Sequence, residues 1–121
     1  RAVGSMISME NGKTMAYSLF NLQDRGTIFV KPATEIYEGM IIGESSKDQD
    51  LTVNSTKNKK LTNVRASGTD EALKLTPPKL MSLEEAIDYI SNDEYVEVTP
   101  ETIRLRKKYL TETDRKRNKK G

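Results

Sequence analysis

The sequence predicts an α+β domain with a small, mostly antiparallel β-sheet or partly open barrel of about six or seven strands. Short β-favouring runs recur at close spacing between turn residues, which favours short connections and antiparallel pairing. A capping box marks one helix, and the remaining features are a long basic loop and a basic C-terminal tail. The 121 residues suit one domain, so we expect residues 1–121 to fold as a single unit.

The N-terminal part predicts a hairpin. Residues 5–10 and 13–20 flank Asn11-Gly12, a pair typical of a two-residue type I′ turn. Gly12-Lys13-Thr14 also resembles the end of a phosphate-binding P-loop. That motif needs a glycine where Ile7 stands and a helix after the threonine, so we expect no nucleotide site here.

The next stretch predicts a turn or short helix followed by strands. Gly26 closes residues 21–26, and residues 27–30 form a strand before Pro32 limits the ladder. The run Met40-Ile41-Ile42 is apolar without alternation, which indicates a strand buried on both faces or the centre of a small barrel. Gly39 and Gly43 bracket it, where bulges or close backbone approaches are expected. Further extended segments are predicted at 35–37, 39–44 and 51–53.

Residues 54–72 predict a long basic loop. Hydrophobic periodicity ends after residue 53, and four cations follow with no acid among them. Loops of this length are usually functional or disordered. Ammonium and guanidinium groups suit phosphate, and amides and hydroxyls suit sugar oxygens, so RNA binding is one interpretation and a solvated surface loop is the other. The cations are Lys57, Lys59, Lys60 and Arg65.

The C-terminal half predicts one firm helix. Residues 72–76 are expected to return as a strand that Pro77 and Pro78 stop. Ser82 and Glu85 have capping-box spacing, and the helix that follows should pack one apolar face on the sheet. That face comprises Leu83, Ala86, Ile87 and Ile90. Glu84 and Asp88 on the same helix are expected to be solvated rather than catalytic.

Two alternating runs follow this helix. Residues 95–98 predict a strand, and residues 103–106 predict an extended piece that places Arg104 and Arg106 on one solvent face; a helix from Glu101 onward competes with this interpretation. Residues 111–120 predict a short helix that frays into a disordered basic tail, which makes 111–121 a second basic segment.

Composition excludes most enzyme chemistry. The chain has no Cys and no His, so it has no disulfide and no imidazole or thiolate catalyst or metal ligand. It has no apolar run long enough to span a membrane and no signal peptide, so we expect a soluble cytoplasmic protein. The chain starts at Arg1, from which we expect a fragment of a larger protein. A basic loop and a basic tail together favour an anionic partner, most often nucleic acid.

Several motifs in order resemble the C-terminal domain of the BipA/TypA family of ribosome-associated translational GTPases. They are AYSLFNLQDRG, EIYEGMIIGE, KKLTNVRASGTDEALKLTPP, MSLEEAIDYI and EVTPETIRLRK. The resemblance implies that the loop reaches the A site of the large ribosomal subunit. The matching loop residues are Lys57, Lys59, Lys60, Leu61, Thr62, Asn63 and Arg65, and we add Arg104, Arg106 and Lys107 as predicted RNA contacts. Ser55-Thr56 and Asn58 depart from many members.

The resemblance also implies the partners of this domain and assigns the GTPase activity to another domain. The large ribosomal subunit, its rRNA, A-site tRNA and the other domains of the same GTPase are the expected partners, with no membrane and with the protein as a monomer. GTP and Mg²⁺ would bind an N-terminal domain absent from this chain, so no cofactor and no enzyme activity are expected here. The intact protein is linked to large-subunit assembly and to stress response. The alternative is a protein-interaction module that docks through the acidic helix and the basic tail.

Overall fold

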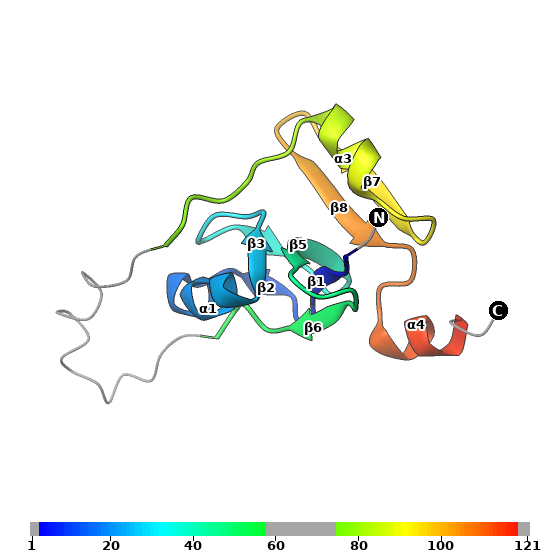
Figure 1. The fold of residues 1–121 in the computed structure, drawn as a ribbon, viewed down its shortest axis with the longest axis horizontal. Helices are drawn as coiled ribbons and strands as arrows, with labels where there is room; N and C mark the ends of the chain where they lie inside the picture. Colours follow the sequence, from blue (N-terminus) through cyan, green and yellow to red (C-terminus); the bar gives the residue numbers. More distant parts are fainter. Residues whose placement is uncertain (1–2, 58–74, 119–121) are drawn as a thin grey trace, which may run out of the picture.

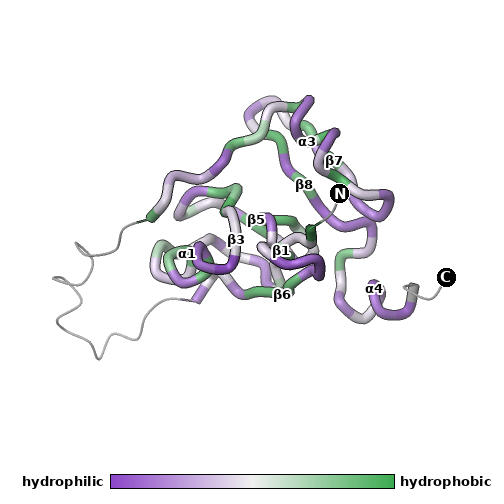
Figure 2. Tube along the Cα trace, viewed as in Figure 1, coloured by the Kyte–Doolittle hydropathy of each residue, from purple (hydrophilic) through white to green (hydrophobic). Residues whose placement is uncertain are grey.

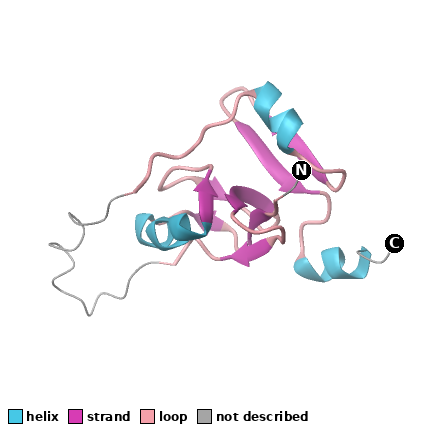
Figure 3. Ribbon diagram, in the orientation of Figure 1, coloured by secondary structure: helices cyan, strands magenta, loops and turns pink. Residues whose placement is uncertain are grey.

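The fold is α+β, as predicted, in a computed structural model that describes residues 3–57 and 75–118. Figure 3 shows short helices at the periphery of the strands. The strands are β1 (Ser5–Ser8), β2 (Gly12–Lys13), β3 (Gly26–Ile28), β4 (Glu35–Ile36), β5 (Met40–Ser45), β6 (Leu51–Val53), β7 (Glu94–Val98) and β8 (Ile103–Lys107). The helices are α1 (Ala16–Leu22), the 3₁₀ turn η1 (Gln23–Arg25), α3 (Leu83–Tyr89) and α4 (Glu112–Asn118).

Six strands form one open sheet in the order β6-β1-β5-β8-β7, with β3 also paired to β5 (Figure 1). The β1/β6 pair is parallel, and the other pairs are antiparallel, which confirms the mostly antiparallel prediction. Strands β2 and β4 form a separate two-stranded sheet. Among the described strands the sheet does not close, so the barrel alternative is wrong.

Strand β5 is the centre of the sheet, as its apolar run predicted. All of its residues except Glu44 are buried. One edge pairs with β1; the other pairs with β3 along residues 43–45 and with β8 along residues 40–41. Gly43 permits the close approach of β3, because an added Cβ would lie 2.6 Å from the Thr27 carbonyl oxygen. The β1/β5 register shifts beside Gly43, so the expected bulge is also present.

The predicted hairpin of residues 5–10 and 13–20 is wrong. Strand β1 pairs with β5 and β6, β2 pairs with β4, and residues 16–22 form helix α1. Leu19 and Leu22, three residues apart, are buried on one face of that helix, which the sheet covers. The sequence carries no capping signal at the start of α1, because Met15 at the N-cap makes no side-chain hydrogen bond.

The capping box of α3 is confirmed in both directions. The Glu85 N–H donates to Ser82 Oγ at 3.1 Å, and the Ser82 N–H donates to Glu85 Oε1 at 2.9 Å. The predicted apolar face is only partly right. Ala86 is fully buried and Ile90 packs on the core, but Leu83 and Ile87 are 42% and 55% exposed. Helix α3 lies beside the β7/β8 hairpin (Figure 1), and Leu83 and Ile87 are on its exposed side.

Strands β7 and β8 form a hairpin, so the competing helix from Glu101 is wrong. Thr99 closes the turn, because its Oγ1 accepts the Thr102 N–H at 2.9 Å. Helix α4 confirms the predicted C-terminal helix as far as Asn118. Of the predicted strand 72–76 only Leu75 and Thr76 are described, and neither is in a strand; the rest lies outside the described residues.

Two apolar clusters fill the fold. The larger one lies between the sheet and α1 and includes Met6, Leu19 and Ile42. The smaller one joins α3 to the β7/β8 hairpin through Phe29, Ala86 and Leu105. Figure 2 shows hydrophobic stretches gathered along β5 and β6 and a hydrophilic α4. No helix in the described part of the chain is long and apolar enough to cross a membrane.

Candidate nucleic-acid interface

The structure describes four of the ten predicted RNA-contacting residues. Lys57 is exposed at the start of the basic loop, and three others lie on β8. The remaining predicted residues lie outside the described residues, and their contacts stay a prediction. They are Lys59, Lys60, Leu61, Thr62, Asn63 and Arg65.

The first end of the basic loop is anchored to α1. The Met15 N–H donates to the Ser55 carbonyl at 2.8 Å, and Ser18 Oγ donates to the Lys57 carbonyl. Asn54 Oδ1 accepts both the backbone N–H and the hydroxyl of Thr56, at 2.9 and 2.7 Å. The chain is therefore held in place up to Lys57.

The second end is anchored beside the first. Leu75 packs against the larger apolar cluster, and the Thr76 N–H donates to Gln23 Oε1 at 2.8 Å. The Lys79 N–H then donates to the Ile28 carbonyl at 2.9 Å, which fixes the chain along β3. Both ends of the basic segment are thus tied to α1 and its η1 extension.

The two anchors bring the ends of the segment close together. Ser18 and Gln23 are five residues apart on a nearly continuous helical stretch, which places them roughly 7 to 8 Å apart along its axis. The chain therefore leaves the described fold and rejoins it beside one helix (Figure 1). The turn or short helix expected at residues 21–26 is confirmed by η1, which holds Gln23. Helix α1, and with it the first anchor, was not predicted; the 3-residue spacing of Leu19 and Leu22 was the available signal.

Arg104 and Arg106 lie on one face of β8, as predicted. The antiparallel register places Tyr95 opposite Arg106 and Glu97 opposite Arg104, so all four side chains share that face. Arg106 Nε lies 3.3 Å from Glu97 Oε2, and the Arg106 guanidinium carbon lies 5.1 Å from the centre of the Tyr95 ring. No carboxylate of the described residues forms an ion pair with Arg104.

Tyr37 joins this face from the segment before β5. Its hydroxyl donates to Glu97 Oε1 at 2.5 Å. Partial burial raises the pKa of Tyr37, and the hydrogen bond to the Glu97 carboxylate and its negative charge raise it further. The positive charges of Arg106 and Arg104 act in the opposite direction but do not outweigh these causes. The phenol stays protonated at neutral pH and holds Glu97 in place.

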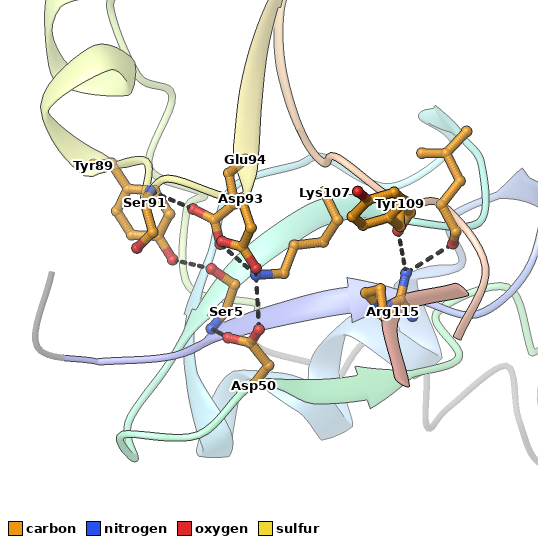
Figure 4. Close-up of polar contacts among 10 residues, drawn as sticks. Ser5, Asp50, Tyr89, Ser91, Asp93, Glu94, Lys107, Tyr109 and Arg115 are labelled. Atoms are coloured by element: carbon orange, nitrogen blue, oxygen red, sulfur yellow. Dashed lines mark hydrogen bonds and ion pairs between the residues drawn. The ribbon is translucent and has the colours of Figure 1, made fainter. Parts of the chain in front are cut away.

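Lys107 points the other way, into the molecule. Only 3% of its side chain is exposed, and its Nζ lies 2.8 Å from Asp50 Oδ2, 3.0 Å from Asp93 Oδ2 and 2.8 Å from Glu94 Oε2 (Figure 4). Burial alone would lower the pKa of Lys107, but the hydrogen bonds to Asp50, Glu94 and Asp93 outweigh it and raise the pKa above its ordinary value. An ammonium enclosed in this way is not presented to RNA, so we leave Lys107 out of the interface.

The basic residues of α4 are also of two kinds, one partly buried and the others exposed. Arg115 is partly buried and donates to the carbonyls of Tyr109 and Leu110, at 3.1 and 2.7 Å, so it fixes α4 to the preceding turn (Figure 4). Lys116 and Arg117 are 77% and 72% exposed and only loosely paired with acids of their own helix. Only these last two are available to an outside anion.

The predicted contact residues do not form one cluster. Lys57 marks the loop beside α1, whereas Arg104 and Arg106 lie on β8, well apart from it in Figure 1. Within the residues that the structure describes, no group of three or more acids forms a metal site. The arrangement offers several separated cationic contacts and one arginine–tyrosine face, which suits an extended anionic polymer better than a small ligand.

Comparison with known proteins shows which family the chain belongs to. A family model described as the TypA/BipA C-terminal domain matches residues 3–112. The chain is 56% identical over 121 residues to the large ribosomal subunit assembly factor BipA of Salmonella typhimurium, which covers 100% of this chain and 20% of that protein. The Escherichia coli K12 protein of that name is 56% identical over 117 residues, 97% of this chain and 19% of the relative. The Bacillus subtilis protein is 50% identical with the same coverage. The chain spans about a fifth of the length of these relatives.

Proposed function

Because the chain belongs to the TypA/BipA C-terminal domain family, we propose that it is the RNA-contacting domain of a ribosome-binding GTPase. Segment 54–72 would enter the A site of the large subunit and contact rRNA or the acceptor end of tRNA. GTP hydrolysis would belong to another domain of the intact protein, whose roles would lie in translation, large-subunit assembly and stress response. The matched relatives are themselves named large ribosomal subunit assembly factors.

One observation carries this proposal. The described chain on both sides of residues 58–74, at Lys57 and at Thr76, is tied to α1 and η1 through Ser18 and Gln23. The segment is therefore presented from a fixed base, which is what insertion into a narrow RNA site requires. Lys57 at its start is already exposed. Lys59, Lys60 and Arg65 would neutralise phosphates, and Asn63 would contact a base or ribose.

Binding of the protein to large ribosomal subunits across a salt series tests the proposal. Each phosphate contact adds roughly 0.7 to 0.9 to the slope of log affinity against log salt. Replacing Lys59 and Lys60 together by alanine should lower both the affinity and the slope. Asn63→Ala should lower the affinity and leave the slope unchanged, because an amide contact releases no counterion.

A matched control removes the same charge elsewhere. Lys47 and Lys108 are exposed and lie outside residues 54–72, so the double alanine variant should bind almost as the wild type does. Equal losses for the two double variants would mean that only net charge matters. Unchanged affinity and slope for the Lys59 and Lys60 variant would leave the segment a solvated connection.

A second candidate function, docking to a protein, is favoured by apolar exposure around α3. Leu83 and Ile87 are exposed on this acidic helix, and Leu80 and Val98 line a groove of about 510 Å³ next to it. Protein docking predicts ribosome binding that Leu83→Ser and Ile87→Ser weaken while the Lys59 and Lys60 variant does not. RNA binding predicts the reverse.

A further inference from the structure

We propose that the outer face of the β7/β8 hairpin is a stacking platform for one unpaired RNA base, with Tyr95 as the stacking ring and Arg104 as the contact to the adjoining phosphate. This inference rests on the proposed function, because it names the part of RNA that a second region of the domain recognises. The face lies on β7 and β8, whereas the described residues that flank the basic segment lie beside α1 (Figure 1).

Tyr95 has the exposure that stacking needs. It lies near the edge of the sheet on β7 and is 44% exposed, although most large hydrophobic or aromatic side chains of the strands are buried. The Arg106 guanidinium lies against its ring at 5.1 Å, so the exposed surface belongs to the rest of the ring. A base placed there would complete a stack of guanidinium, phenol and base.

The platform is held in place before any ligand arrives. Glu97 accepts the Tyr37 hydroxyl with one carboxylate oxygen and pairs with Arg106 through the other. Arg106 in turn lies against Tyr95, so one chain of contacts runs from the core side of β5 to the exposed ring. Side chains that are fixed in this way lose little rotamer freedom on binding.

Charge separates the roles of the two arginines. Arg106 is paired with Glu97, whereas Arg104 makes no ion pair with any described carboxylate and lies across from Glu97 on the same face. Arg104 therefore supplies the net positive charge of the platform. A phosphate is the matching anion, and an unpaired nucleotide carries a base and a phosphate on adjoining groups. Double-stranded RNA offers phosphates but no free base face, so the platform should discriminate against it.

Titration of the protein with a short single-stranded oligoadenylate, and with an RNA duplex of the same length, tests the inference. Tyr95→Ala should weaken binding to the single strand by about 5- to 100-fold with an unchanged salt slope, since stacking releases no counterion. Arg104→Ala should lower both the affinity and the slope, by roughly 0.7 for one contact to a single strand. Tyr95→Ala should not alter duplex binding.

Two further variants keep the test independent of folding. Tyr95→Phe retains the ring and should keep the affinity. The chain has 5 Tyr and no Trp, so oligoadenylate should quench tyrosine fluorescence in the wild type and quench it less in Tyr95→Phe. Tyr109→Ala is the matched control, because Tyr109 also has a cation near its ring, the Lys108 ammonium at 5.6 Å, but lies beyond β8. It should bind as the wild type does.

The outcomes separate the two proposals. A wild type that binds ribosomal subunits with the expected salt dependence, but binds oligoadenylate equally well with Tyr95→Ala or not at all, overturns the platform and leaves the proposed function standing. Equal losses for Tyr95→Ala and Tyr109→Ala also overturn it. A wild type that binds neither subunits nor oligoadenylate overturns both.

Discussion

Replacing Lys107 by methionine should destabilise the fold by about 3 kcal/mol, because it removes the buried ammonium that pairs with three carboxylates. Methionine keeps most of the aliphatic volume, so the loss is mainly electrostatic. Removing one partner of a buried ion pair costs roughly 3 to 5 kcal/mol. Asp50 and Asp93 are 36% and 59% exposed and can be solvated by water, so we expect the lower end of that range.

Most of the cost should arise at Glu94. Its side chain has no exposed surface, and its Oε1 already accepts the Ser91 N–H at 2.8 Å. Double-mutant cycles with Glu94→Gln and Asp93→Asn separate the contributions. The coupling of Lys107 to Glu94 should be about 2 kcal/mol, whereas that to the exposed Asp93 should be below about 1 kcal/mol.

Urea unfolding of the wild type, the single variants and the two double variants gives these free energies. A cost of less than about 1 kcal/mol for Lys107→Met, or a coupling of Asp93 to Lys107 as strong as that of Glu94, would refute a buried and largely dry ammonium. Either result would mean that water reaches the ammonium as freely as it reaches a surface lysine.

The pH dependence gives an independent check. The pKa of Lys107 is raised in the folded protein, so its stabilising effect is complete below the unfolded-state pKa of about 10.4 and is lost as pH rises through the folded value. Unfolding free energies measured from neutral to strongly alkaline pH should therefore fall less for Lys107→Met than for the wild type. Equal alkaline losses would contradict the raised pKa.

Three further predictions concern single side chains. Tyr37→Phe should lower the free energy of unfolding by about 1 kcal/mol, because the hydrogen bond to partly exposed Glu97 is lost. The variant should also lose less stability above about pH 10 than the wild type, because the raised pKa of Tyr37 opposes ionisation in the folded state. Urea unfolding at pH 7 and pH 11 measures both effects. Ser55→Ala should stabilise the fold by about 1 kcal/mol, since its buried hydroxyl has no hydrogen-bond partner among the described residues, and a lower melting temperature would contradict this. Gly39→Ala should cost about 2 kcal/mol or more, because Gly39 has φ +93° and a Cβ there would lie 2.6 Å from Leu110 Cα; a wild-type urea midpoint would count against it.

Local signals predicted the parts of the fold that local chemistry decides. Ser82 and Glu85 specify the start of α3 through their own hydrogen bonds, and the apolar run in β5 requires burial on both faces. The Asn11-Gly12 pair led to the wrong hairpin prediction, because a turn signal does not specify which strands pair. The true partners of β1 are β5 and β6, and contacts so distant in sequence leave no local trace.

At the candidate nucleic-acid interface, too, local sequence signals predicted only part of the arrangement. Alternation along β8 predicted that Arg104 and Arg106 share a face, and the same alternation places Lys107 with buried Leu105 on the opposite face. A buried lysine is stable there because three carboxylates from two other segments pair with its ammonium. Asp50 comes from one segment, and Asp93 and Glu94 come from the other. That combination follows from the tertiary structure and not from composition, so the sequence predicts Lys107 as an RNA contact together with Arg104 and Arg106.

The position of β8 in the sheet has a consequence for the order in which the protein is made. Strand β5 is complete early in synthesis, and β1, β3 and β6 lie close to it in sequence. Its edge at residues 40–41, however, has no partner until β8 emerges, after the whole stretch 54–102 has been translated. An unpaired edge on a growing chain invites pairing with other chains. The nascent domain should therefore be most prone to aggregate in this interval, and a chain truncated before Ile103 should need a chaperone that the full chain does not.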